Sequence, residues 1–117
     1  MKLPNAENAI TTQDKLTEYL LSPSHLIGKW KARFFLSIGF GKTKTDDLKS
    51  ALLHVAKSGE VTNRQTTDFG IKYVVDGVIR GPSGKTANVR TVWVKEQGQD
   101  QPRLVTAYPV QQIGENA

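Results

Sequence analysis

The sequence predicts an α+β fold in which three N-terminal helices pack on one face of a C-terminal antiparallel β-meander of three to four strands. Apolar residues recur at helical spacing as far as Gly59, and beyond it they alternate with polar residues as in strands. Two polar, glycine-containing turns, residues 81–84 and 97–100, divide the alternating half. The 117 residues suit a single domain. Its core is expected at residues 3–109, with 110–117 as a frayed tail.

The N-terminal half contains three segments with helical periodicity and capping signals. A serine or threonine precedes each apolar stripe, where its side chain caps the first turn. Glycines end the second and third segments, and Asp46 and Asp47 suit the positive end of the third helix dipole. The expected helices therefore cover residues 11–21, 22–41 and 43–60.

Three alternating, β-rich segments follow the helices. The turns between them suggest a register, because residues that flank a tight turn face each other. Arg80 is expected opposite Lys85, and Glu96 opposite Gln101. The expected strands are residues 69–80, 85–96 and 102–110.

This register divides the strand residues into two sets, because successive side chains point to opposite faces. The set assigned to the helices is Ile71, Tyr73, Val75, Asn88, Arg90, Val92, Val94, Arg103, Val105 and Ala107. The set expected on an open face is Lys72, Val74, Asp76, Val89, Thr91, Trp93, Leu104, Thr106 and Tyr108.

The expected open face combines hydroxyls, which suit phosphate or sugar contacts, with rings on which bases stack. An ordinary cross-strand threonine pair with good β-propensity would explain Thr91 and Thr106 as well. A single β-bulge would exchange the two faces.

Charge and residue types narrow the function further. Sixteen Lys and Arg against eleven Asp and Glu give a net charge of +5, which favours polyanionic partners, nucleic acid first. The absence of cysteine excludes disulfides and thiolate chemistry. With two histidines and scattered carboxylates, we expect no metal and no cofactor. No segment has the pattern of a signal peptide or the roughly 20 apolar residues of a membrane span, so we expect a cytoplasmic protein.

The second helical segment carries two candidate catalytic side chains. His25 lies at its N-terminal end, where helices favour phosphate and a neutral histidine suits a general base. A loop histidine without a catalytic role is the alternative. Lys31 falls inside the apolar arc, between Phe35 and Ile38. Its ammonium either reaches solvent along the helix or belongs to a cationic site.

Four short motifs stand out: H-x-x-G-x-x-K-A at residues 25–32, G-P-x-G-[KR] at 81–85, T-V-W at 91–93 and P-R-L-V-T at 102–106. Together they resemble a family of small bacterial domains of unknown function, found as standalone proteins and at the C-termini of polymorphic toxins and phage-derived proteins. The resemblance covers residues 3–109. More distantly, helices followed by an antiparallel sheet resemble the barnase, EndoU, colicin and RelE group of metal-independent ribonucleases, which work from the open face of the sheet.

The resemblance implies a metal-independent endoribonuclease toxin of a toxin–antitoxin or polymorphic-toxin type. Such a toxin would cleave RNA, for example tRNA or mRNA, through a 2′,3′-cyclic phosphate, and a cognate antitoxin or immunity protein would inhibit it. The implied catalytic residues are His25 as base or acid, Lys31 and Arg103 as charge stabilisers, Lys72 as phosphate ligand or second proton carrier, and Thr91 and Thr106 as phosphate ligands. The residues expected to bind RNA are Arg90, Trp93 and Tyr108.

Two other functions remain open. The same fold would serve a non-catalytic nucleic-acid- or protein-binding module, because the sequence offers a single candidate catalytic histidine and lacks both the His–His–Lys set of EndoU and the Glu–Arg–His set of barnase. An immunity or antitoxin protein fits less well, because proteins that neutralise basic nucleases are commonly acidic.

Overall fold

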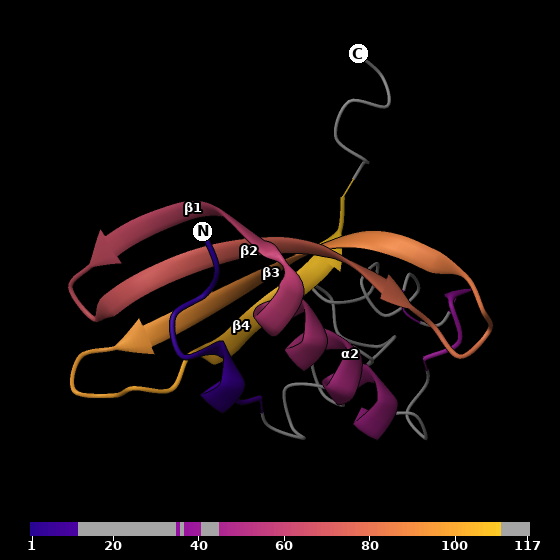
Figure 1. The fold of residues 1–117 in the computed structure, drawn as a ribbon, viewed down its shortest axis with the longest axis horizontal. Coiled ribbons are helices and arrows are strands. Elements are labelled where there is room, and N and C mark those ends of the chain that lie inside the picture. The colour runs from indigo at the N-terminus through magenta and orange to yellow at the C-terminus, as the bar shows by residue number, and fades with distance from the viewer. Residues whose placement is uncertain (12–34, 36, 41–44, 111–117) are drawn as a thin grey trace, which may run out of the picture.

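The computed structural model describes residues 1–11, 35, 37–40 and 45–110. One four-stranded antiparallel sheet dominates it, with the strands in the order β1-β2-β3-β4 (Figure 1). The elements are the 3-10 helix η1 (Ala6–Asn8), the α-helix α2 (Thr45–Ser58), and the strands β1 (Glu60–Thr67), β2 (Gly70–Arg80), β3 (Thr86–Glu96) and β4 (Arg103–Pro109).

The expected α+β class with three N-terminal helices on the sheet is wrong. The part of the chain that the structure describes is mostly β and contains a single α-helix, α2. The expected helices at residues 11–21 and 22–41 lie almost wholly outside the described residues. The third expected helix corresponds to α2, with both ends trimmed, and the sheet has one strand more than the three segments assigned from the pattern.

Helix α2 forms where its apolar residues share one face. Leu48, Leu52, Val55 and Ala56 are buried at helical spacing, and Asp46 and Asp47 occupy the first turn. The helix ends at the buried Gly59, whose amide donates a hydrogen bond to the carbonyl of Val55. A Cβ on Gly59 would lie 2.6 Å from the carbonyl oxygen of Asp76, so the chain passes from helix to sheet where only glycine fits.

The alternation of apolar and polar residues did not predict strand β1, because this strand is polar on both faces. Only Val61 is half-buried, and the other seven residues of Glu60–Thr67 are exposed. Alternation carries no signal where neither face enters a core. The strand forms because the two-residue turn Asp68–Phe69 folds it back on β2, with Thr67 opposite Gly70.

The expected register of the next hairpin is wrong by one residue. Arg80 lies opposite Thr86 instead of Lys85, so the connection comprises five residues, 81–85. The connection is held against Ile38, whose carbonyl accepts hydrogen bonds from the amide and the hydroxyl of Ser83. Gly81 leaves no room for a Cβ beside that same carbonyl. The extra residue turns every β3 side chain to the opposite face from the one expected.

A bulge in β4 changes the register again. Trp93 lies opposite Leu104, as expected, but the pairing shifts between Val92 and Trp93, so that Val92 faces Thr106. The one-residue difference between β2 and β3 made the assignment of faces wrong for many residues, whereas the bulge leaves Thr106, Ala107 and Tyr108 on their expected faces. Those found on the face away from α2 instead of toward it are Asn88, Arg90, Val92, Val94 and Arg103, and those found toward α2 instead of away from it are Val89, Thr91, Trp93 and Leu104.

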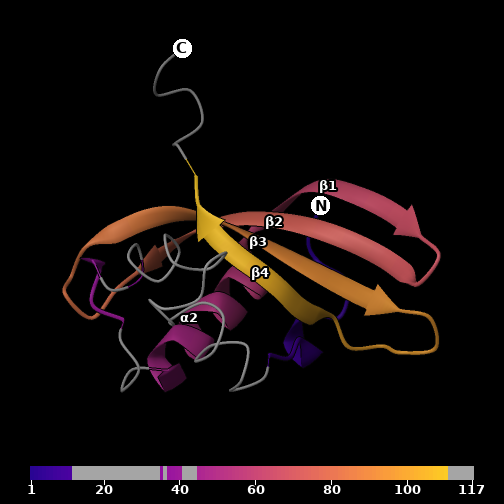
Figure 2. The ribbon, with the colours of Figure 1, turned by 180° about the vertical axis from the view of Figure 1, so that it is seen from behind.

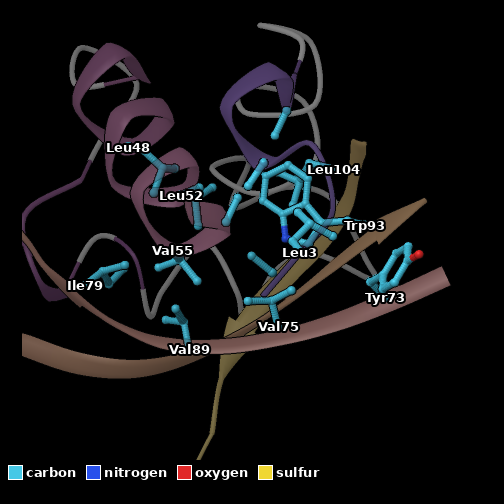
Figure 3. Packing of buried hydrophobic residues seen from close by; sticks show 14 of the residues in the cluster. Leu3, Leu48, Leu52, Val55, Tyr73, Val75, Ile79, Val89, Trp93 and Leu104 are labelled. Carbon is cyan, nitrogen blue, oxygen red and sulfur yellow. The ribbon is translucent and has the colours of Figure 1, made fainter. Parts of the chain in front are cut away.

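The core lies between α2 and the sheet. Figure 3 shows Leu48, Leu52 and Val55 of the helix facing Val75 and Val89 of the sheet, with Trp93 and Leu104 beyond them. The N-terminal segment closes this layer. It begins at β1, where the Val61 amide donates to the Met1 carbonyl, and ends at β4, where Ile10 forms a parallel bridge with Arg103.

Trp93 is fully buried, and its indole N–H needs an acceptor there. The hydroxyl of Thr91 provides it at 2.7 Å and donates its own hydrogen to the carbonyl of Val75 at 2.8 Å. A threonine in the core thus satisfies the one polar atom of the largest core side chain. None of the helices in the described residues is long and apolar enough to span a bilayer.

Thr91→Val is expected to lower the free energy of unfolding by about 1–3 kcal/mol, because it leaves the buried indole N–H of Trp93 without an acceptor. Urea denaturation followed by circular dichroism measures the change. Thr86→Val, at an exposed position of the same strand, is the control and should stay within about 0.5 kcal/mol. An equal loss in both variants would contradict the role given to the Thr91 hydroxyl.

Candidate functional site

The candidate site is the face of the sheet that points away from α2. Both ribbon views show η1 and α2 on one side of the sheet, which leaves the other side uncovered by the described helices (Figures 1 and 2). Alternation from the buried residues Val75 and Trp93 identifies its members. The central part of this open face consists of Lys72, Val74 and Asp76 from β2, Arg90, Val92 and Val94 from β3, and Arg103, Thr106 and Tyr108 from β4.

An ion pair occupies the middle of the open face. Arg90 donates from Nε to Oδ1 of Asp76 at 2.9 Å and from Nη2 to Oδ2 at 3.0 Å, a bidentate arrangement across neighbouring strands. Tyr108 lies opposite Arg90 on the other side, in β4. The hydrogen bond to Asp76 raises the pKa of Arg90 above its ordinary value, and burial opposes this effect. The guanidinium is thus fixed in position and permanently charged.

Two further cations flank Val94 toward one end of the face. Arg103 donates from Nη2 to Oε1 of Glu96 at 2.7 Å, and both side chains are nearly half exposed. An exposed pair of this kind contributes about 0–1 kcal/mol and leaves the arginine able to exchange partners. Lys72 is half-buried and forms no ion pair with any described residue. The open face therefore carries cations from three strands.

The structure gathers only some of the residues expected in the site. Lys72, Thr106 and Tyr108 lie on the open face, as expected, and Arg90 and Arg103 join them there although the helix side was expected. Thr91 and Trp93 are completely buried on the helix side, so neither is available to a ligand. His25 and Lys31 lie outside the described residues.

Sequence reasoning missed the role of Asp76 as the partner of Arg90. An acidic and a basic residue, Asp76 and Arg90, at facing positions of a hairpin would have indicated the pair. The expected register was wrong by one residue and placed these two side chains on opposite faces of the sheet. Within the described residues, no three side chains of the metal-binding types His, Cys, Asp and Glu come together.

Over residues 2–111 the chain matches the family described as "Domain of unknown function (DUF6883)" and so belongs to it. The expectation that it belongs to a family of unknown function is thereby confirmed. No curated protein matches the chain.

The fold also resembles a solved structure. One chain of the "Contact-dependent growth inhibition toxin - immunity protein complex from Klebsiella pneumoniae 342" matches with a TM-score of 0.70 and 14% sequence identity. The match covers 92% of this chain and 97% of that one. At this identity, the similarity shows a shared fold.

Asp76→Ala is expected to lower the free energy of unfolding by about 1 kcal/mol, because it leaves the half-buried Arg90 without its carboxylate. The Arg90 side chain is 36% exposed, so water partly solvates the unpaired guanidinium. The expected loss of folding free energy therefore lies at the low end of the range for charged groups. In a double-mutant cycle, Asp76→Ala/Arg90→Ala should cost less than the sum of the two single changes. Glu96→Ala, which breaks the exposed pair with Arg103, should stay within about 0.5 kcal/mol. Strict additivity in the cycle would show that the central pair contributes no coupling.

Proposed function

We propose that this chain is the toxin domain of a toxin–immunity pair and that it acts on RNA. The observation that carries the proposal is the fold match, which spans nearly the whole of both chains and leads to a toxin–immunity complex. The net charge of +5 favours the toxin over the immunity side of such a pair, because partners that neutralise basic nucleases are commonly acidic. The proposed partner of this domain is therefore a cognate immunity protein.

RNA is the proposed target because of the side chains on the open face. The planar guanidinium of Arg90 is held by Asp76 and by a hydrogen bond with Tyr108, so that little side-chain freedom is lost when an N–H group turned away from both partners binds a phosphate. Tyr108, opposite Arg90, adds a ring of the kind on which bases stack, and Lys72 adds a further positive charge. Phosphate contacts together with a stacking ring suit a single-stranded nucleic acid.

The proposed chemistry is metal-independent cleavage. A base takes the proton of the ribose 2′-hydroxyl, whose oxygen attacks phosphorus, and an acid protonates the leaving 5′-oxygen, so that a 2′,3′-cyclic phosphate and a 5′-hydroxyl result. We assign His25 as base or acid and Lys31 and Arg103 as cations that stabilise the phosphorane. Lys72 would bind the phosphate or carry the second proton, and Thr106 would orient the phosphate.

A non-catalytic binding module is the second candidate. It is favoured by the carboxylates of the open face, because Asp76 and Glu96 already compensate two of its three central cations. Among the described residues, the one histidine is His54, which is exposed on α2. It lies on the opposite side of the sheet from the open face, so it cannot act on a ligand bound there. On this alternative, the open face would bind a ligand without transforming it.

Incubation of the purified protein with total RNA and with a tRNA pool in EDTA tests the catalytic proposal. Discrete fragments that end in a 2′,3′-cyclic phosphate are expected, and they should disappear in the His25→Ala/Lys31→Ala variant. His54→Ala is the matched histidine control and should cleave normally. Intact RNA after incubation with folded, inhibitor-free protein would overturn the ribonuclease proposal and leave the binding module.

Lys72→Ala is expected to weaken binding of a single-stranded RNA oligonucleotide and to reduce the slope of log affinity against log salt by about 0.7, because one phosphate contact is lost. Fluorescence anisotropy over a salt series measures both quantities. Lys49→Ala removes an equal charge from the exposed side of α2 and should leave the slope unchanged. Equal slopes for the two variants would show that RNA does not contact the open face at Lys72.

A further inference from the structure

The outer side of β1 is an edge of the sheet. The N-terminal segment protects the start of this edge, where the amide of Val61 donates to the carbonyl of Met1 at 2.9 Å. The opposite edge receives similar cover from Ile10, which bridges to Arg103 in β4. Beyond Val61, none of the described residues pairs with the outer side of β1, which runs along the margin of the sheet in Figure 1.

The residues of this edge are suited to strand pairing. Between Thr62 and Thr67 there is no proline and no lysine, two of the residues with which proteins commonly block an exposed edge. An irregularity between Val61 and Asn63 lies at the start of the segment, and residues 63–67 pair regularly with β2. Three of the six are β-branched threonines, and all six are exposed. In an antiparallel strand, alternate residues direct both backbone groups outward, so this segment presents a row of donors and acceptors to a further strand.

An exposed aromatic side chain lies in the turn that follows β1. Phe69, in the turn between β1 and β2, is 80% exposed. Its backbone is tied on both sides, because its amide donates to the Thr67 hydroxyl at 3.2 Å and its carbonyl accepts from the amide of Gln97 at 3.1 Å. Exposed aromatic residues on a fixed backbone are typical anchors of protein interfaces.

The charge of the edge indicates the kind of partner. Arg64 is the one charged residue between Thr62 and Thr67, and its guanidinium lies 6.0 Å from the centre of the Tyr73 ring. Glu60, at the start of the strand, is already engaged by the Met1 ammonium and by Lys2. A second copy of this chain would bring two molecules of charge +5 together and would add an arginine to the facing strand.

We infer that β1 accepts an extended strand from an acidic protein partner, which continues the sheet along Thr62 to Thr67 and ends beside Phe69 in the following turn. Main-chain hydrogen bonds hold the added strand, a partner carboxylate faces Arg64, and a partner apolar side chain packs on Phe69. Only the identification of that partner as the immunity protein rests on the proposed function. The surface lies on the margin of the sheet, so a partner on β1 leaves the central cations of the open face in place.

A short acetylated peptide of alternating threonine and valine, with one central glutamate and a terminal leucine, is the probe. Its binding is followed by NMR through amide hydrogen exchange. Slower exchange is expected for amides between Thr62 and Thr67 and unchanged exchange in β4. A peptide with a central lysine should bind about fivefold more weakly. This readout requires neither toxicity nor RNA cleavage, so it succeeds or fails independently of the proposed function.

Variants of exposed residues test the two side-chain contacts. Arg64→Glu should weaken binding of the glutamate peptide about fivefold and reverse the preference between the two peptides, whereas Arg64→Lys should bind as the parent does. Phe69→Ala should weaken binding about fivefold or more. Arg80→Glu makes the same charge change at the far end of β2 and should have no effect.

Three results would overturn the inference. They are unchanged exchange between Thr62 and Thr67 at saturating peptide, an equal loss of binding in Arg64→Glu and Arg80→Glu, and self-association of the free chain that Arg64→Glu abolishes. The last result would assign the edge to a second copy of this chain in place of an acidic partner.

Discussion

The burial of Trp93 is the constraint on which the sheet depends. A side chain of this size needs a position where the sheet, η1 and α2 enclose it, and its N–H needs an acceptor in the same place. The Thr91 hydroxyl meets that need and returns a hydrogen bond to Val75 in the neighbouring strand. With Thr91 and Trp93 committed to the core, alternation directs Arg90, Val92 and Val94 to the opposite face.

The composition of the open face follows from the burial of Thr91 and Trp93. Arg90 emerges beside Asp76 because the five-residue connection between β2 and β3 pairs those positions. The bulge in β4 then adjusts the last strand, so that Leu104 enters the core while Arg103 and Thr106 both remain outside. The collection of cations on one face thus results from the five-residue connection, which turns Arg90 and, through its pairing with Val94, Arg103 to the face of Lys72. The bulge keeps Thr106 and Tyr108 on that same face.

The two surfaces proposed as functional are separate and differ in character. The central cations of the open face lie on β2, β3 and β4, where side chains meet a ligand. The edge of β1 offers backbone groups, with Arg64 and Phe69 as additional contacts. A domain with both surfaces can bind a protein along its margin while the sheet face stays accessible. Inhibition by such a partner then requires that it also extend over the face.

Helix α2, the strands β2 to β4 and the positions of the two connections between them could be predicted from the sequence, because burial on one side imposes a period of 3.6 or 2 on the residues. Charge and composition also indicated a polyanionic target, and that target stays a prediction, as does the single domain. The existence of β1 could be seen only in the folded chain, because its polar residues show no periodic pattern of burial. Tertiary structure also decided which side chains share a face, because a one-residue difference at Lys85 and Thr86 changes every assignment on β3.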